Sequence, residues 1–161
     1  MTDYKPRIGD YGVIRSTGLF ARLIQIGTVS RWNHAFIYVG DGNIVEATPK
    51  GVILSPVSKY NLIAWNQHEE LDSKERYIIA DFALSKIGQP YNFIVIANLA
   101  LRILGLKVLA NTKLLYKMAQ GEGYICSELT AECYKVAGAD LFTKAPDLVT
   151  PGDLTERLVY M

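Results

Sequence analysis

The 161-residue chain is poor in cysteine and histidine, with two of each. Cys126 and Cys133 fall in one predicted helix, where a rise of about 1.5 Å per residue places their Cα atoms roughly 10 Å apart. A disulfide needs Cα atoms within about 7 Å, so we expect both thiols to be unpaired. The sequence also lacks Cys-x-x-Cys, His-Glu-x-x-His and Gly-x-x-x-x-Gly-Lys patterns, and we therefore expect no metal, no cofactor and no phosphate-binding loop.

Long runs of one charge are missing as well. Lysine and arginine are scattered and the net charge is +1. A nucleic-acid binder normally carries a basic stripe or face, so we expect no nucleic-acid partner. The first residues are polar and contain no apolar signal core, which predicts a protein that is cytoplasmic as synthesised.

No uninterrupted apolar stretch has the length of a membrane span. Residues 93–109 are strongly apolar, but Asn98, Arg102 and Lys107 interrupt them. A spanning helix usually needs about 20 mostly apolar residues. We expect a buried or surface-docked helical hairpin here, with a peripheral membrane contact through 93–109 as the alternative.

Enough apolar residues are present for one core. Half of the 161 residues are hydrophobic, which predicts a single domain over 1–161. Residue patterns and turn signals predict an α+β fold. Strands are expected at 11–15, 33–39, 43–47 and 51–54, helices at 19–26, from Asp72 to about 87, and 126–137, and helix or paired helices at 93–118. Residues 56–71 look irregular.

Cys126 stands where a glycine-rich loop turns into a predicted helix. A free thiol has a pKa near 8.5, and a helix N-terminus or a neighbouring imidazolium lowers it. The N–H groups of the first turn can also stabilise an oxyanion. Cys126 and Cys133 also share a helix face with apolar residues, and the alternative is that both are small core residues. Ser127 is expected to help cap the helix.

The predicted hairpin carries a histidine on one strand and a carboxylate on the other. If Gly42 is the left-handed last residue of a three-residue loop, Phe36 lies opposite Glu46. His34 shares a face with Phe36, so Glu46 would lie diagonal to it and could orient its ring. With a two-residue turn, Glu46 would point to the other face as a solvated carboxylate, and His34 would be a packed strand residue. The second histidine, His68, is expected to be solvated.

These residues occur in an order that resembles the circularly permuted NlpC-type papain-like cysteine hydrolases, in particular the YiiX-like branch, in which the histidine strand precedes the cysteine helix. The matching pieces span nearly the whole chain. They are Ile8-Gly9-Asp10, the stretch from Asn33 to Gly42, Val45-Glu46-Ala47, Ile87 to Phe93, Cys126-Ser127-Glu128-Leu129 and Pro151-Gly152-Asp153-Leu154.

The resemblance implies a small antiparallel sheet or half-barrel packed against helices, including the cysteine helix. It implies Cys126 as nucleophile, His34 as general base and Glu46 as its polar partner, meeting in a solvent-reachable groove. By the same resemblance a tyrosine hydroxyl lies near the oxyanion, and the candidates are Tyr124 and Tyr38. Where the family usually has glycine two positions after the histidine, this chain has Phe36, which would narrow the cleft.

The function implied is hydrolysis of an amide or peptide bond through an acyl-enzyme, with a bacterial cell-wall peptide or another amide-containing molecule as substrate. The source implied is a bacterium or phage, and the site of action the cell envelope. Two alternatives stay open. One is a lipid-directed thiol acyltransferase or phospholipase at a membrane surface, and the other is a non-catalytic binding module on the same fold.

Overall fold

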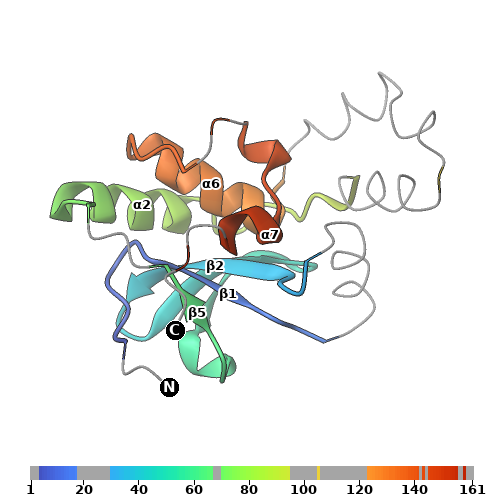
Figure 1. Cartoon of the computed structure of the whole chain (residues 1–161), viewed down its shortest axis with the longest axis horizontal. Coiled ribbons are helices and arrows are strands. Elements are labelled where there is room, and N and C mark those ends of the chain that lie inside the picture. Colours follow the sequence, from blue (N-terminus) through green and yellow to red (C-terminus); the bar gives the residue numbers. More distant parts are fainter. Residues whose placement is uncertain are drawn as a thin grey trace.

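The computed structural model describes residues 4–17, 30–66, 70–94, 105, 123–141, 143, 145–155 and 158. In this part of the chain, one antiparallel sheet of five strands carries the α-helices on one face (Figure 1). The expected helix at 19–26, most of the apolar stretch 93–118 and His68 lie outside the described residues.

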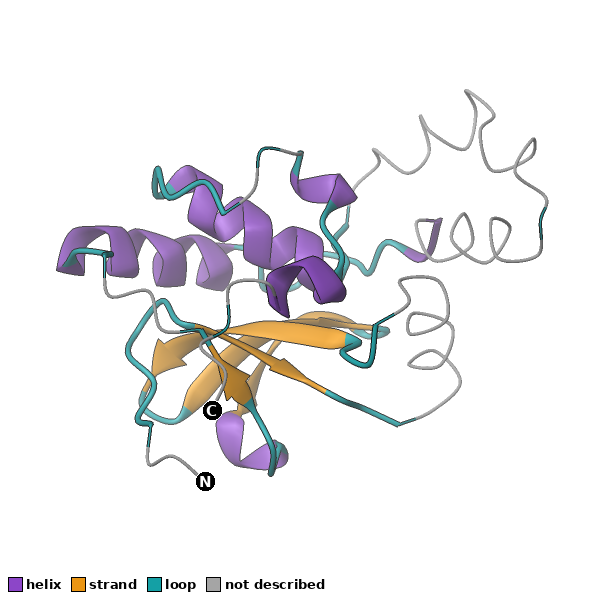
Figure 2. Ribbon diagram, in the orientation of Figure 1, coloured by secondary structure: helices purple, strands orange, loops and turns teal. Residues whose placement is uncertain are grey.

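The strand order is β4-β3-β2-β1-β5. The strands are β1 (Tyr11–Ile14), β2 (His34–Gly40), β3 (Asn43–Thr48), β4 (Gly51–Pro56) and β5 (Ala64–Trp65). The helices are α2 (Ser73–Ser85), α6 (Cys126–Val136) and α7 (Pro151–Leu154), and the short 3-10 turns are η1 (Val57–Lys59) and η2 (Pro146–Leu148). In Figure 2 the three α-helices lie above the sheet and η1 lies below it.

Most of the elements expected in these residues are confirmed, within one or two residues at their ends. α2 begins with the capping box expected from its sequence, since Asp72 accepts from the N–H of Glu75 and Glu75 accepts from the N–H of Asp72. The expectation of an irregular segment at 56–71 is wrong in part, because this segment contains η1 and β5. Both are too short to produce a periodic pattern.

Apolar side chains are buried on both faces of the sheet. On the helix face, Ala35 and Ile37 of β2 pack in one cluster with Leu129 of α6. On the other face, Phe36 packs with Trp65 in a second cluster. Each fully buried large apolar side chain contributes about 1.5–3 kcal/mol. β2 therefore has little freedom to move, which fixes the position of its first residue, His34.

Buried hydrogen bonds attach α6 to the sheet. The hydroxyl of Tyr134 donates to the carbonyl of Gly9 over 2.7 Å and accepts from the Asn66 side chain over 2.9 Å. Next to them, Arg76 of α2 pairs with the buried carboxylate of Asp10 at 2.7 Å. Buried polar groups need such partners, so these bonds specify how the helix layer sits on the sheet.

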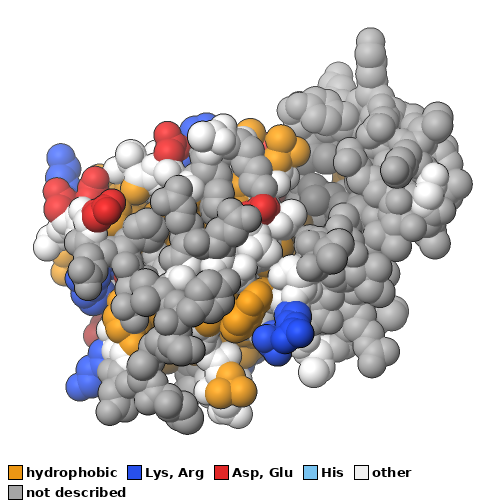
Figure 3. All heavy atoms as spheres, viewed as in Figure 1, with side chains coloured by type: hydrophobic (Ala, Val, Ile, Leu, Met, Phe, Trp, Pro, Cys, Tyr) orange, Lys and Arg blue, Asp and Glu red, His pale blue; other side chains and the backbone are white. Residues whose placement is uncertain are grey.

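Acidic and basic side chains occur in several small groups on the face of the described residues shown in Figure 3. None of the described helices combines the length and the apolar composition that crossing a bilayer requires.

Candidate active site

The start of α6 places Cys126 next to the sheet. A close approach of the preceding loop to residues 90–92 requires glycine at position 123, where φ is +123° and a Cβ atom would lie 2.7 Å from the Pro90 carbonyl oxygen. Hydrogen bonds hold this loop on both sides of Tyr124, whose N–H donates to Pro90 over 3.0 Å and whose carbonyl accepts from the N–H of Asn92 over 3.2 Å. The position of the helix start is therefore defined by neighbouring backbone.

His34 reaches Glu46 because of an irregularity in the hairpin. The turn consists of Asp41 and Gly42, with φ of +50° and +73°, and closes on the pair Gly40 and Asn43. This is the two-residue turn, which alone would direct Glu46 to the other face.

A bulge between Tyr38 and Gly40 shifts the register by one, so that Tyr38 lies opposite Ile44 and Ile37 opposite Val45. Continued by one residue, this register places Phe36 opposite Glu46, as the three-residue loop would. Glu46 consequently lies on the face of His34.

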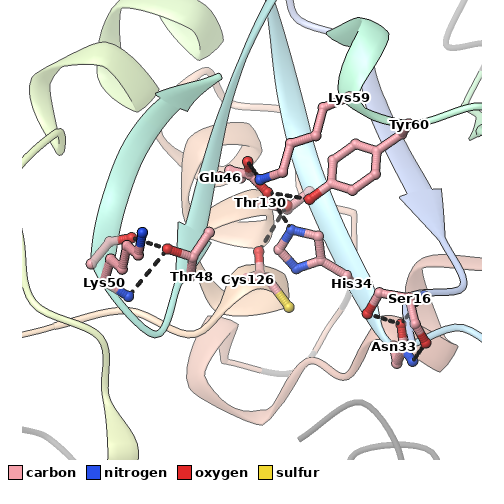
Figure 4. A network of polar contacts seen from close by, with 11 residues as sticks. Ser16, Asn33, His34, Glu46, Thr48, Lys50, Lys59, Tyr60, Cys126 and Thr130 are labelled. Atoms are coloured by element: carbon pink, nitrogen blue, oxygen red, sulfur yellow. Dashed lines mark hydrogen bonds and ion pairs between the residues drawn. The ribbon is translucent and has the colours of Figure 1, made fainter. Parts of the chain in front are cut away.

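The imidazole of His34 lies between Glu46 and Cys126. Its Nε2 atom is 2.7 Å from Oε2 of Glu46, and the thiol of Cys126 is a second hydrogen-bond partner of the ring. Figure 4 shows the sulfur beside the ring nitrogen that faces away from Glu46. The structure thus brings the three predicted residues together in one chain of contacts.

The surroundings of the sulfur favour a thiolate. Burial by itself would raise the pKa of Cys126, but the hydrogen bond and charge of His34, together with N–H groups of Ala35 and Ser127, lower it below the usual thiol value. Burial would likewise lower the pKa of His34, but the hydrogen bonds and charges of Cys126 and Glu46 raise it to about 9. At neutral pH these shifts favour a thiolate paired with an imidazolium.

Glu46 is fully buried, yet its partners favour the ionised form. Burial raises the pKa of its carboxyl, and hydrogen bonds from its partners outweigh this and hold the pKa far below the usual range. Lys59 donates to Oε1 over 2.7 Å and Tyr60 donates to Oε2 over 2.6 Å. Ser55 adds a further hydrogen bond. A buried carboxylate with this many donors is a permanent negative charge beside the imidazole.

The site is more enclosed than expected. Only 3% of Cys126 is exposed, because its side chain packs in the cluster under the helices, whereas the side chain of His34 is 13% exposed. The thiol expected to be solvent-reachable is therefore almost fully covered, and the imidazole is the more accessible member of the pair.

The tyrosines expected near the oxyanion point elsewhere. The hydroxyl of Tyr124 hydrogen bonds Glu132, and its ring lies 5.5 Å from Nζ of Lys86. The hydroxyl of Tyr38 accepts from the N–H of Gly42 over 3.1 Å, at the turn end of β2. Both hydroxyls thus have partners other than the Cys126 thiol.

Sequence reasoning missed the residues that surround the pair. Tyr91 is buried and close enough for the charge of Cys126 to raise its pKa further above the usual value, in addition to the effect of burial. Lys59 and Tyr60 lie in the segment expected to be irregular, and no local signal connects them with Glu46. Ser127, expected as a helix cap, instead donates its hydroxyl hydrogen to the carbonyl of Val149 over 2.6 Å.

Among the described residues, no three histidine, cysteine or acidic side chains gather in a way that could hold a metal ion. No protein-family model matches the chain, and no curated protein matches it. The geometry around Cys126 is accordingly the basis for a function.

Proposed function

We propose that the protein is a cysteine hydrolase of the circularly permuted, papain-like NlpC type that cleaves an amide or peptide bond through an acyl-enzyme. The observation that carries this proposal is the contact chain Glu46–His34–Cys126, in which the imidazole joins a buried carboxylate to a thiol at a helix start. The antiparallel sheet under a cysteine helix supports the papain-like fold.

In the proposed reaction the Cys126 thiolate attacks the substrate carbonyl carbon, so that a C–S bond forms and an electron pair moves to the oxygen. N–H groups of the first turn of α6 stabilise this oxyanion, and we assign the Tyr91 hydroxyl as the tyrosine donor in place of Tyr124 and Tyr38. The C–N bond then breaks while the His34 imidazolium gives its proton to the leaving nitrogen.

Deacylation uses the same groups, and His34 now accepts a proton instead of donating one. Neutral His34 takes a proton from water, the resulting hydroxide attacks the acyl carbon, and the C–S bond breaks to restore the thiolate and the imidazolium. Glu46 stabilises the imidazolium in both half-reactions and does not itself need to accept a proton.

The test is a substrate panel assayed with the purified chain and with Cys126→Ala. We expect bacterial cell-wall stem peptides or related amides to release one new amine and one new carboxylate, seen by mass spectrometry, and Cys126→Ala to release neither. Deacylation of phosphatidylcholine vesicles without any amide cleavage would support a lipid-directed enzyme instead. If an alkylating reagent labels the Cys126 thiol as slowly as an ordinary thiol, the result would support a binding module.

A further inference from the structure

Two cationic groups share the carboxylate of Glu46. Nε2 of His34 lies 2.7 Å from Oε2, and Nζ of Lys59 lies 2.7 Å from Oε1. The carboxylate is fully buried, whereas the Lys59 side chain is 43% exposed. One negative charge at the base of the site therefore balances the imidazolium on one side and an ammonium group that reaches solvent on the other.

The turn that supplies Lys59 is held firmly against the hairpin. The N–H of Val57 donates to the carbonyl of Gly42 over 2.8 Å, and the N–H of Tyr60 donates to Val57 over 3.1 Å. The Tyr60 ring stacks on Phe36 with centroids 5.4 Å apart and planes 5° apart. The same ring meets the edge of His34 at 6.1 Å. The position of Lys59 next to Glu46 is thus set by backbone and ring contacts.

Phe36 has its own place in this arrangement. Its ring occupies the space above Gly12 on β1, the residue directly opposite it. Phe36 is buried on the sheet face that carries Tyr60, where it supports the turn that holds Glu46.

We propose that Lys59 is a positioning residue that shares the charge of Glu46 with His34, weakening the hold of Glu46 on the imidazolium so that His34 can release its proton to the leaving nitrogen. This inference rests on the proposed function, because only a hydrolytic cycle requires His34 to give up its proton.

The sign of the effect follows from the charges around His34. The imidazole contacts Cys126 of α6, Glu46 of β3 and the ring of Tyr60, and Tyr91 lies near Cys126. Lys59 lies on the other side of the carboxylate, against Oε1 of Glu46. The thiolate and the carboxylate stabilise the imidazolium, and among these groups Lys59 is the one whose positive charge opposes it. Removing that charge raises the pKa of His34, although solvent screening at the exposed ammonium keeps the effect moderate.

The experiment is a titration of His34 by NMR, using its ring signals in a His68→Gln background so that a single histidine is observed. We expect Lys59→Met to raise the pKa of His34 from about 9 to between about 9.5 and 10. Lys59→Arg keeps the charge and should leave the pKa near its original value. Lys74→Met removes an exposed charge from α2 and serves as the matched control.

Turnover provides a second readout. Because acylation by an amide needs the leaving nitrogen protonated and acylation by an activated ester does not, Lys59→Met should lower the single-turnover acylation rate for the amide about 3- to 10-fold, with little change in KM for the amide or in the acylation rate for the ester.

A pKa of His34 that stays the same or falls toward about 6.5 in Lys59→Met would overturn the inference, because a merely structural lysine would loosen the Glu46 contact. If Lys59→Met does not fold, Lys59→Gln is titrated under the same criterion. Failure of the proposed function is distinguishable, since it would appear in the unmodified chain as a slow Cys126 thiol and no amide cleavage.

Discussion

Oε2 of Glu46 accepts from both Nε2 of His34, at 2.7 Å, and the hydroxyl of Tyr60, at 2.6 Å. A carboxylate oxygen has room for two donors, so neither has to be displaced. The ring of His34 is thereby fixed from one edge, and its other nitrogen faces Cys126. The direction of the imidazole depends on a buried charge that water does not reach.

The two thiols should differ sharply in reactivity. Cys126 has a lowered pKa because of His34, whereas burial raises the pKa of Cys133 well above its usual value. We expect a small alkylating reagent at pH 6 to 7 to label Cys126 rapidly and Cys133 not at all, measured by mass spectrometry of the digested protein. A bulky maleimide should be slower at Cys126, since only 3% of this residue is exposed. Equal, slow labelling of both thiols would contradict the ion pair.

Removal of the imidazole should return Cys126 to ordinary thiol behaviour. In His34→Ala the pKa of Cys126 rises to about 8.5 or higher, so about 3% or less of the thiol is ionised at pH 7 and labelling slows about 30-fold or more. Far-UV circular dichroism should remain that of the unmodified chain, because His34 lies at the end of β2. An unchanged labelling rate in the folded variant would show that the pair does not activate the thiol.

Local patterns predicted the parts of the site that depend on local structure. The glycine loop before Cys126 and the Asp72–Glu75 capping box are short-range signals, and the structure contains both elements. The strand register of the hairpin was harder to predict. The turn and the bulge each shift the register, and only their combination returns Glu46 to the face of His34. Sequence spacing cannot reveal such a compensation.

Contacts between segments that are distant in the chain could not be predicted from sequence patterns. Lys59 and Tyr60 meet Glu46 only because β4 runs back along β3 and η1 then folds under the hairpin. Tyr91 approaches Cys126 because the loop after α2 lies beside the loop before α6. A charged residue in an irregular segment looks solvated until the sheet that it covers is known.

Neutralising Glu46 without changing its shape should weaken the pair. In Glu46→Gln the side chain can still accept from His34, but the charge that stabilises the imidazolium is gone, so the pKa of His34 should fall by about 1 or more from about 9. NMR titration of His34 measures this directly. Glu75→Gln, in the capping box of α2, is the control and should leave the titration unchanged. An unaltered His34 pKa in Glu46→Gln would show that the charge of Glu46 does not stabilise the imidazolium.

The dependence of stability on pH should reveal the ion pair. The folded pKa of His34 is raised to about 9, so its contribution is complete below the unfolded value of about 6.5 and is lost as pH rises through 9. Cys126 has a lowered pKa, so its contribution is complete above about 8.5 and is lost as pH falls.

These two slopes oppose each other between about pH 6.5 and 8.5. The contribution of the pair to the free energy of unfolding should therefore be nearly constant there. In Cys126→Ala the Cys126 slope is gone, whereas a smaller His34 slope remains because Glu46 still stabilises the imidazolium. Stability should therefore fall with rising pH relative to the unmodified chain. Urea unfolding at a series of pH values measures the difference, and parallel curves for the two proteins would contradict a charged pair.

A side chain at position 12 should destabilise the protein because of the ring of Phe36. A Cβ atom at position 12 would lie 2.5 Å from Cε2 of Phe36 and 2.7 Å from Cγ2 of Ile63, so both side chains would have to move. We expect Gly12→Ala to destabilise the protein by about 1–3 kcal/mol, as overpacking of a core usually does. The measurement is the free energy of unfolding from urea denaturation. Because leucine lacks the ring, the same change in a Phe36→Leu background should cost clearly less, and an equal cost in both backgrounds would mean that the Phe36 ring is not what requires glycine on β1.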